Sequence, residues 1–411
     1  MKGMMAGVRV LEYSSYAACA NVGKLLGLWG ADVIKVEPPV KGEVFRVMGT
    51  LTNMPIDEDE NPAFQLCNSN KRGVSINTKS EEGKELFIRL LGTCDVFLTN
   101  VRMASLKKNG LDWETIHERF PGLVYCHISG WGPKGPQAGE PGFDTTCYWA
   151  VSGALADLAP AGGPPIPASY GVGDQHMAMY GAGSIAAALY HRSVSGQGAL
   201  VTPSLLGVGV QGHGMMTTYC QRPYTDRGYG IHYPKGHFNP TLPTFNSYLC
   251  SDGEWVMITV TEYAEKFPSF CRLFGIPESV WTDPRFSTVE ASQQPDNLRE
   301  IVGIIDEAIA KHTSAEVVEM MKSADLVATT YTHFPDFAEN EQAHANGNFE
   351  HFTFENGSVI SLPANPVLFN NGEDNYSLTA APKVGEHNAE VFSALGYSPE
   401  QLEDLRQRQI I

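Results

Sequence analysis

Basic side chains are scarce in this chain. Its 411 residues include 29 Lys and Arg against 46 Asp and Glu, which gives a net charge of −17 at pH 7. A surface with this excess of carboxylates repels nucleic acid and anionic membranes, so we expect neither as a partner. An anionic small-molecule substrate would need a local group of basic residues set against this background.

Long apolar runs are also missing. No stretch of about 18 consecutive apolar residues occurs, which argues against a membrane-spanning helix. Residues 1–7 make a poor signal peptide because they hold one lysine and no long apolar run. The eight cysteines form no C-x-x-C pair, and most lie in apolar runs, a pattern typical of reduced, buried thiols. We therefore expect a cytoplasmic protein.

Several cofactor and catalytic motifs are absent as well. The 12 histidines include no H-E-x-x-H motif and no cluster with Cys or Asp at ligand spacing, so we expect no metal site. Neither a Walker loop nor a G-x-S-x-G elbow occurs. Residues 207–212 match G-x-G-x-x-G, but they fall inside a predicted helix and not after a strand. No dinucleotide cofactor is therefore indicated.

Strand and helix patterns alternate over the first 130 residues. Strands are predicted at 8–13, 31–37, 73–77, 95–99 and 123–129, with helices between them at 21–29, 80–91, 104–109 and 112–120. This alternation predicts a mostly parallel sheet covered by helices on both faces, an α/β fold. We expect residues 40–70 to form a polar surface loop, and Thr202-Pro203 to start a helix that runs toward Gln221.

The pattern changes near residue 223. A hairpin pattern over 245–260 precedes helices near 262–274, 296–311 and 314–323, which predicts a smaller α+β domain. A second hairpin pattern over 349–362 centres on Asn356-Gly357. We expect a large α/β domain over residues 1–222, a small domain over 223–330, and a last segment over 331–411.

The stretch Tyr170–Asp174 holds the strongest candidate for chemistry. Gly171 and Gly173 permit a tight turn just before a helix predicted over 175–192, which puts Asp174 at or near the N-cap. Backbone N–H groups and the helix dipole at that position favour an ionised carboxylate. The stretch alone leaves two roles open: an ordinary N-cap, worth about 1 kcal/mol, or a carboxylate nucleophile on a glycine turn.

The order of several short motifs resembles the family III CoA-transferases, of the formyl-CoA transferase and carnitine-CoA transferase type. The matching segments are Gly30–Glu37, Asn70–Arg72, Ser129–Pro136, Pro141–Asp144, Gly173-Asp174, Ala187–Arg192 with Gly196–Gly198, and Gly385–His387. The resemblance implies a Rossmann-like large domain built from both chain ends, with residues 331–411 returning to it. It also implies an interlocked homodimer in which each chain threads through the other.

The resemblance further implies the chemistry. Asp174 matches the nucleophile that attacks an acyl-CoA thioester, and a small carboxylic acid then accepts the CoA; coenzyme A is a substrate, with no tightly bound cofactor. Residues at the family's CoA-contacting and acyl-contacting positions are Asn77, Lys79, Asn100, Arg102, Lys108, Phe143 and Asp144. Lys108 stands where the family has an arginine, and Val101–Met103 replaces a Phe-Gly-Pro-Gly run.

Two departures bear on the substrate. Ala17 stands where formyl-CoA transferases carry an active-site glutamine, and Pro38 stands where they carry a CoA-binding arginine. The chain is therefore more similar to the clostridial branch that acts on aryl or branched 2-hydroxy acids, such as phenyllactate with cinnamoyl-CoA.

Two other functions stay open. The α-methylacyl-CoA racemases also resemble this chain, but they pair the aspartate with a histidine of a Gly-His-Asp triplet, because racemisation needs a base on each face of the α-carbon. The triplet here is Gly142-Phe143-Asp144, and phenylalanine takes no proton. A non-catalytic CoA-binding protein is the other alternative, which the intact Gly173-Asp174 pair disfavours.

Overall fold

The computed structural model describes residues 2–411, which form two compact units. The larger unit comprises Met1–Ser152, Ala168–Gly214 and Ala338–Ile411, so both ends of the chain contribute to it. The smaller unit comprises Gly153–Pro167 and Met215–Phe337. None of the helices within residues 2–411 combines the length and the hydropathy needed to cross a membrane.

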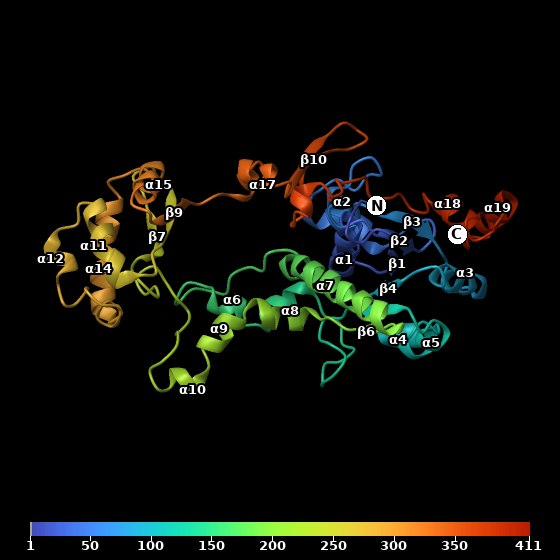
Figure 1. Cartoon of the computed structure of the whole chain (residues 1–411), viewed down its shortest axis with the longest axis horizontal. Helices are drawn as coiled ribbons and strands as arrows, with labels where there is room; N and C mark the ends of the chain where they lie inside the picture. The colour runs from blue at the N-terminus through green and yellow to red at the C-terminus, as the bar shows by residue number, and fades with distance from the viewer. Residues whose placement is uncertain (1) are drawn as a thin grey trace. The chain divides into compact units, whose positions relative to one another are not determined.

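The larger unit is built on a six-stranded parallel sheet with the order β3-β2-β1-β4-β5-β6 (Figure 1). The strands are β1 (Arg9–Tyr13), β2 (Asp32–Glu37), β3 (Arg72–Ser75), β4 (Val96–Thr99), β5 (Val124–His127) and β6 (Leu200–Val201). The predicted α/β fold with a parallel sheet is therefore confirmed. The strand order reverses between β1 and β4, which is where α/β sheets open a crevice for ligands.

Helices connect and cover these strands. They are α1 (Ala17–Leu28), α2 (Pro62–Asn68), α3 (Glu81–Leu91), α4 (Met103–Lys108), α5 (Trp113–Arg119), α7 (Val172–Ser195), α8 (Leu205–Gly212), α17 (Glu341–Ala345), α18 (Asn388–Ser393) and α19 (Pro399–Gln407), with the 3₁₀-helices η1 (Val44–Thr52) and η3 (Asn370–Gly372) and the π-helix η2 (Asp144–Ala150). A hairpin of β10 (Phe349–Thr353) and β11 (Val359–Pro363) precedes η3.

One face of the sheet packs into a core that joins distant parts of the chain. Leu11, Phe97 and Tyr125 from the strands meet Phe87 of α3 and, from the far end of the chain, side chains of α18 and α19. Alternate strand residues point to the opposite face, where α1 runs across β1, β2 and β4 and packs against α7. At Gly181 of α7 an added Cβ would lie 2.5 Å from Val22, so the missing side chain permits this close approach.

The smaller unit has a core of its own. It contains a three-stranded antiparallel sheet in the order β7-β8-β9. Its elements are α6 (Ala154–Asp157), α9 (Gly214–Tyr219), α10 (Arg222–Thr225), β7 (Phe245–Leu249), β8 (Trp255–Thr259), α11 (Tyr263–Leu273), α12 (Glu278–Trp281), α13 (Val289–Ser292), α14 (Pro295–Ile309), α15 (Ser314–Ser323), β9 (Val327–Thr330) and α16 (Phe334–Phe337). Side chains such as Tyr248, Phe270 and Ile305 fill the space between sheet and helices.

Two local predictions were wrong. Residues 40–70 are not a loop, because they fold into η1 and α2, and Phe64, Cys67 and Asn68 of α2 are buried. The helix after β6 begins at Leu205, and its N-cap is Ser204, whose Oγ accepts a hydrogen bond from the N–H of Gly207. The first N–H groups of a helix have no partner within the helix, and the hydroxyl of Ser204 accepts a hydrogen bond from one of them. This capping explains why the helix begins at Leu205 and not at Pro203.

Candidate active site

A cavity of about 550 Å³ lies within the larger unit at the reversal of strand order. Its walls include residues that lie just past the ends of three adjacent strands: Tyr16 three residues after β1, Asn100 after β4 and Ile128 after β5. The carboxyl ends of parallel strands share one edge of a sheet, so these residues meet there. Asp174, at the start of α7, also lines this cavity.

The apolar part of the wall comes from the segment that was predicted to be a loop. Phe45, Met48 and Leu51 of η1 and Leu66 and Cys67 of α2 line the cavity. Sequence reasoning missed them because the acidic run Asp57–Glu60 in the same segment favoured a solvated loop. The spacing of Phe45, Met48 and Leu51, one apolar residue every three, was a usable signal, since side chains at i and i+3 share a face of a 3₁₀-helix.

Asp174 is not the N-cap of its helix. Helix α7 begins at Val172 with Gly171 as N-cap in the left-handed conformation at φ 71°, so Asp174 is the third helical residue. The capping role belongs to Asp144 of η2, whose Oδ1 accepts a 2.6 Å hydrogen bond from the N–H of Gly173. A Cβ on Gly173 would lie 2.4 Å from that same oxygen, so glycine is required for this contact.

The carboxylate of Asp174 is also less acidic than the sequence indicated. Burial, with a smaller contribution from the Asp144 carboxylate, raises the pKa of Asp174 to about 7. Burial likewise raises the pKa of Asp144, although the N–H groups at the start of α7 act in the opposite direction. The expected preference for the ionised form is therefore wrong for Asp174, because the turn's N–H groups bind Asp144 instead.

Tyr16 occupies a strained position beside this pair. Its backbone has φ 63° and ψ −168°, a region that residues other than glycine rarely adopt. Two side chains hold it there: Glu43 Oε2 accepts a 2.8 Å hydrogen bond from Tyr16 N, and the carboxamide of Asn100 bonds both to the N–H (3.0 Å) and to the carbonyl (2.6 Å) of Ser15. Its ring makes an edge-to-face contact with Phe143, with 5.5 Å between ring centroids.

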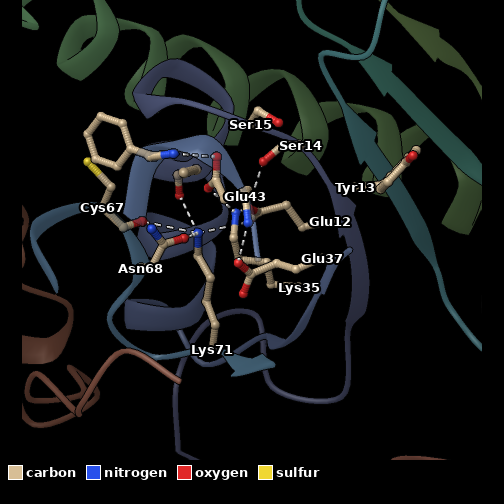
Figure 2. A network of polar contacts seen from close by, with 12 residues as sticks. Glu12, Tyr13, Ser14, Ser15, Lys35, Glu37, Glu43, Cys67, Asn68 and Lys71 are labelled. Carbon is tan, nitrogen blue, oxygen red and sulfur yellow. Dashed lines mark hydrogen bonds and ion pairs between the residues drawn. The ribbon is translucent and has the colours of Figure 1, made fainter. Parts of the chain in front are cut away.

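Glu43 belongs to a buried network of charges (Figure 2). Lys35 Nζ lies 2.8 Å from Glu43 Oε1 and 3.0 Å from Glu12 Oε1, and Lys71 Nζ lies 2.8 Å from Glu12 Oε2. Burial alone would lower the pKa of Lys35, but Glu12 and Glu43 raise it above its usual value. Burial alone would raise the pKa of Glu12, but Lys35 and Lys71 lower it. The network therefore stays charged and fixes the loop that carries Tyr16.

A second cavity of about 450 Å³ adjoins the first. The two share Tyr16, Asn100 and Phe143 among their lining residues. Arg102, the N-cap of α4, lines the second cavity, together with the glycine- and proline-rich segment 129–142. The site thus consists of an apolar chamber with two carboxylates next to a chamber with a cationic side chain, with Tyr16 and Phe143 at the junction.

Comparisons with known proteins show the family to which the chain belongs. The family model described as CoA-transferase family III matches residues 5–388. The chain belongs to this family. It is 36% identical over 408 residues to the (R)-2-hydroxy-4-methylpentanoate CoA-transferase of Clostridioides difficile, covering 99% of both chains. It is 32% identical over 403 residues to the cinnamoyl-CoA:phenyllactate CoA-transferase of Clostridium sporogenes, covering 98% of this chain and 96% of that one.

Solved structures show the same fold. A CAIB/BAIF family protein from Brucella suis superposes with a TM-score of 0.80 at 25% identity, covering 96% of this chain and 100% of that one. The predicted family and its CoA-transferase activity are confirmed, and CoA thioesters are the substrates of such enzymes.

Of the nine residues proposed at the site of this family III CoA-transferase, six line one or both of the two cavities. Ala17, Asn100, Phe143, Asp144 and Asp174 all line the 550 Å³ cavity, and Arg102 lines the adjoining one. Asn77, Lys79 and Lys108 line neither. Asn77 Oδ1 accepts a hydrogen bond from Lys79 N in the turn after β3, and Lys108 is exposed at the end of α4.

Two groups of residues were not anticipated. Asn21 of α1 lines the main cavity, but an asparagine inside an apolar helix carries no motif that marks it. In the β10–β11 region, Glu339, His344 and His351 each offer a possible metal-ligand atom within 4.8 Å of the others. This group does not line either cavity, and the spacing of the histidines along the sequence did not indicate it.

Proposed function

We propose that this enzyme transfers CoA from an acyl-CoA to a carboxylic acid through covalent intermediates on Asp174. The observation that supports the proposal best is the position of this carboxylate. It borders a cavity at the sheet's switch point, near the start of a helix where Asp144 accepts a hydrogen bond from the N–H of Gly173. Within residues 2–411 no cation or hydrogen-bond donor pairs with it, so one oxygen is free to act as nucleophile.

The proposed steps balance without any added reagent. An oxygen of ionised Asp174 attacks the thioester carbonyl carbon, the C–S bond breaks, and CoA leaves as a thiolate, which gives a mixed anhydride. The thiolate then attacks the Asp174 carbonyl carbon, releasing the donor acid as a carboxylate and forming an enzyme thioester. The acceptor carboxylate repeats the two steps in reverse order and departs as the new acyl-CoA.

The substrates we propose are aryl or branched 2-hydroxy acids and their CoA esters. The lining of the chamber around Asp174 includes Phe45, Met48, Leu51, Tyr16 and Phe143, which suits a bulky apolar acyl group. The named substrates of the two clostridial relatives are of this kind. We place the CoA moiety in the adjoining chamber near Arg102, with Asn77, Lys79 and Lys108 farther along its path.

The assembly we propose is a homodimer, interlocked as the family resemblance implies. The support in this chain is the outer face of α7 and the segment after it, where large apolar side chains are exposed: Tyr180, Tyr190, Val194, Leu200 and Val210. A row of apolar side chains on one protein face usually marks a protein interface.

Chemical trapping tests the mechanism. The enzyme is incubated with a reactive acyl-CoA and then with hydroxylamine, which should convert Asp174 to a hydroxamate, or with borohydride, which should reduce the enzyme thioester to an alcohol. Peptide mass mapping over residues 170–192 reads both products. A racemase that uses Asp174 as a proton carrier gives neither, and a non-catalytic CoA-binding protein gives neither. An unmodified peptide during continuing CoA exchange would contradict the covalent mechanism.

A further inference from the structure

Asn21 is a buried carboxamide without hydrogen bonds. It is 2% exposed, and within residues 2–411 neither its Oδ1 nor its Nδ2 has a hydrogen-bond partner. Buried side-chain amides in native proteins are nearly always satisfied, so an exception needs a reason. Asn21 lines the same cavity as Asp174, which makes a bound ligand the natural partner for the group.

The start of helix α1 faces the same cavity without a cap. The N-cap residue is Tyr16, whose side chain makes no capping hydrogen bond, and the first turn holds no acidic residue. Ala17 and Ala18, which open the helix, line the cavity. The first N–H groups of a helix have no partner inside the helix and carry a partial positive charge, so this end attracts negatively charged oxygen.

The loop before α1 is held rigidly enough to keep this end in place. Glu43 and Asn100 fix the strained Tyr16 and its neighbour Ser15 by three hydrogen bonds. Strain of this kind persists where surrounding contacts determine the conformation, and it is concentrated at functional sites. The nearby cations do not substitute for these donors, because Lys35 and Lys71 are bound to Glu12 and Glu43.

We propose that the carboxamide of Asn21 and the first N–H groups of α1 bind the acyl oxygen of the CoA ester that reacts at Asp174. The inference rests on the covalent mechanism proposed above. When Asp174 attacks the thioester carbonyl, the π electrons move to the carbonyl oxygen, and this oxyanion needs donors until the C–S bond breaks. Asn21 Nδ2 and the helix N–H groups supply them in a site that otherwise presents two carboxylates.

The substitution Asn21→Leu separates a catalytic role from a structural one. Leucine has a similar volume and no polar atoms, so it removes an unsatisfied group from the interior. We expect the denaturant midpoint to stay the same or to rise, while kcat falls about 10²–10³-fold, the usual cost of losing one oxyanion donor. The KM for the CoA ester should change little, because the donor acts mainly on the transition state.

Asn68 provides the matched control. It is equally buried, but its Oδ1 accepts a 2.9 Å hydrogen bond from Lys71 and its Nδ2 donates a 3.2 Å bond to the carbonyl of Phe64. Asn68→Leu should therefore lower the denaturant midpoint. If Asn21→Leu lowers the midpoint in the same way and activity falls only in proportion to the folded fraction, Asn21 is a structural residue and the inference is wrong.

Trapping distinguishes this inference from the proposed function. In wild-type enzyme the Asp174 hydroxamate should form, and in Asn21→Leu it should form more slowly by the same factor as kcat. If Asn21→Leu traps at the wild-type rate, the oxyanion role is overturned while the covalent mechanism stands. If wild-type enzyme traps nothing while CoA exchange continues, the covalent mechanism fails and the role of Asn21 fails with it.

Discussion

Asp174 combines two demands that conflict near neutral pH. The nucleophile must be ionised, yet burial and Asp144 raise its pKa to about 7. We expect kcat/KM for the acyl-CoA to rise with pH through about 7 and to fall about tenfold per pH unit well below it. Asp144→Asn keeps an oxygen for Gly173 N and removes the neighbouring charge, so it should move the midpoint to lower pH. A flat profile between pH 6 and 8 would contradict this assignment.

The same pKa has a consequence for stability. The folded-state pKa of Asp174 lies above its usual value of 3.8, so folded protein binds the proton more tightly than unfolded protein. Stability from this group is therefore lost as the pH rises from about 4 to about 7. Asp174→Asn should be more stable than wild type at pH 8, by up to about 4 kcal/mol, because the pKa rises from 3.8 to about 7 and each pH unit is worth ~1.4 kcal/mol. Urea titrations at pH 8 and pH 4 check this, since the difference should vanish at pH 4.

Arg102 and Lys108 differ in where they lie. Arg102 lines the chamber next to the carboxylates, whereas Lys108 is exposed at the end of α4 and lines neither chamber. We expect Arg102→Ala to raise the KM for CoA esters about tenfold, more at low ionic strength, where charges are less screened. Lys108→Ala should have a smaller effect. A larger effect at Lys108, measured across a salt series, would place the nucleotide end of CoA nearer α4.

The sequence made part of this site predictable and hid the rest. The turn formed by Gly171, Gly173 and Asp174 could be recognised in the sequence, because glycine adopts backbone angles that other residues avoid. Asp144 was placed near the acyl group, but its bond to Gly173 N was not foreseeable, because the two residues are 29 positions apart. Asn21 left no pattern at all, since an unsatisfied amide is defined by neighbours that only the fold brings together.

Helices and strands with strong periodicity were placed well. The segments around β1, β2, β4 and β5, with α3 and α5, lie close to their predicted positions because apolar residues and N-caps such as Ser80 and Asp112 mark them. Residues 44–68 were missed because η1 is a 3₁₀-helix that buries only Gly49 and α2 is a helix of seven residues, so neither has a strong pattern.

The segment that leads from β2 into η1 carries the clamp on Tyr16. Glu43→Ala removes both the acceptor for Tyr16 N and one partner of buried Lys35, so we expect a loss of about 3–5 kcal/mol in unfolding free energy. Tyr16→Gly relieves the strained φ. We therefore expect Tyr16→Gly to lower the unfolding free energy less in the Glu43→Ala background than in the wild-type background. Urea unfolding of both single variants and the double variant measures this coupling. Simple additivity would show that Glu43 does not hold Tyr16.

The proposed homodimer predicts self-association through the outer face of α7. Tyr190 and Val194 are each 74% exposed although both are large and apolar. We expect the enzyme to be a dimer in solution at micromolar concentration, and Val194→Glu to weaken the dimer without unfolding the chain. Sedimentation velocity, with circular dichroism as the folding control, tests both points. A wild-type monomer at these concentrations would contradict the proposed assembly.

The larger unit is closed by residues from the far end of the chain, and this affects how the protein is made. Ser75 N donates to Asn388 Oδ1 across a sequence separation of 313 residues, and α18 and α19 complete the core on one face of the sheet. At about 5–20 residues per second, a ribosome takes roughly 15–60 s to synthesise the intervening segment. Throughout that time β1 to β3, and β4 and β5 once they are made, lack the helices α18 and α19 on this face. We therefore expect chaperones that bind the emerging chain to affect the yield of folded enzyme. They should have less effect on the stability of the finished protein.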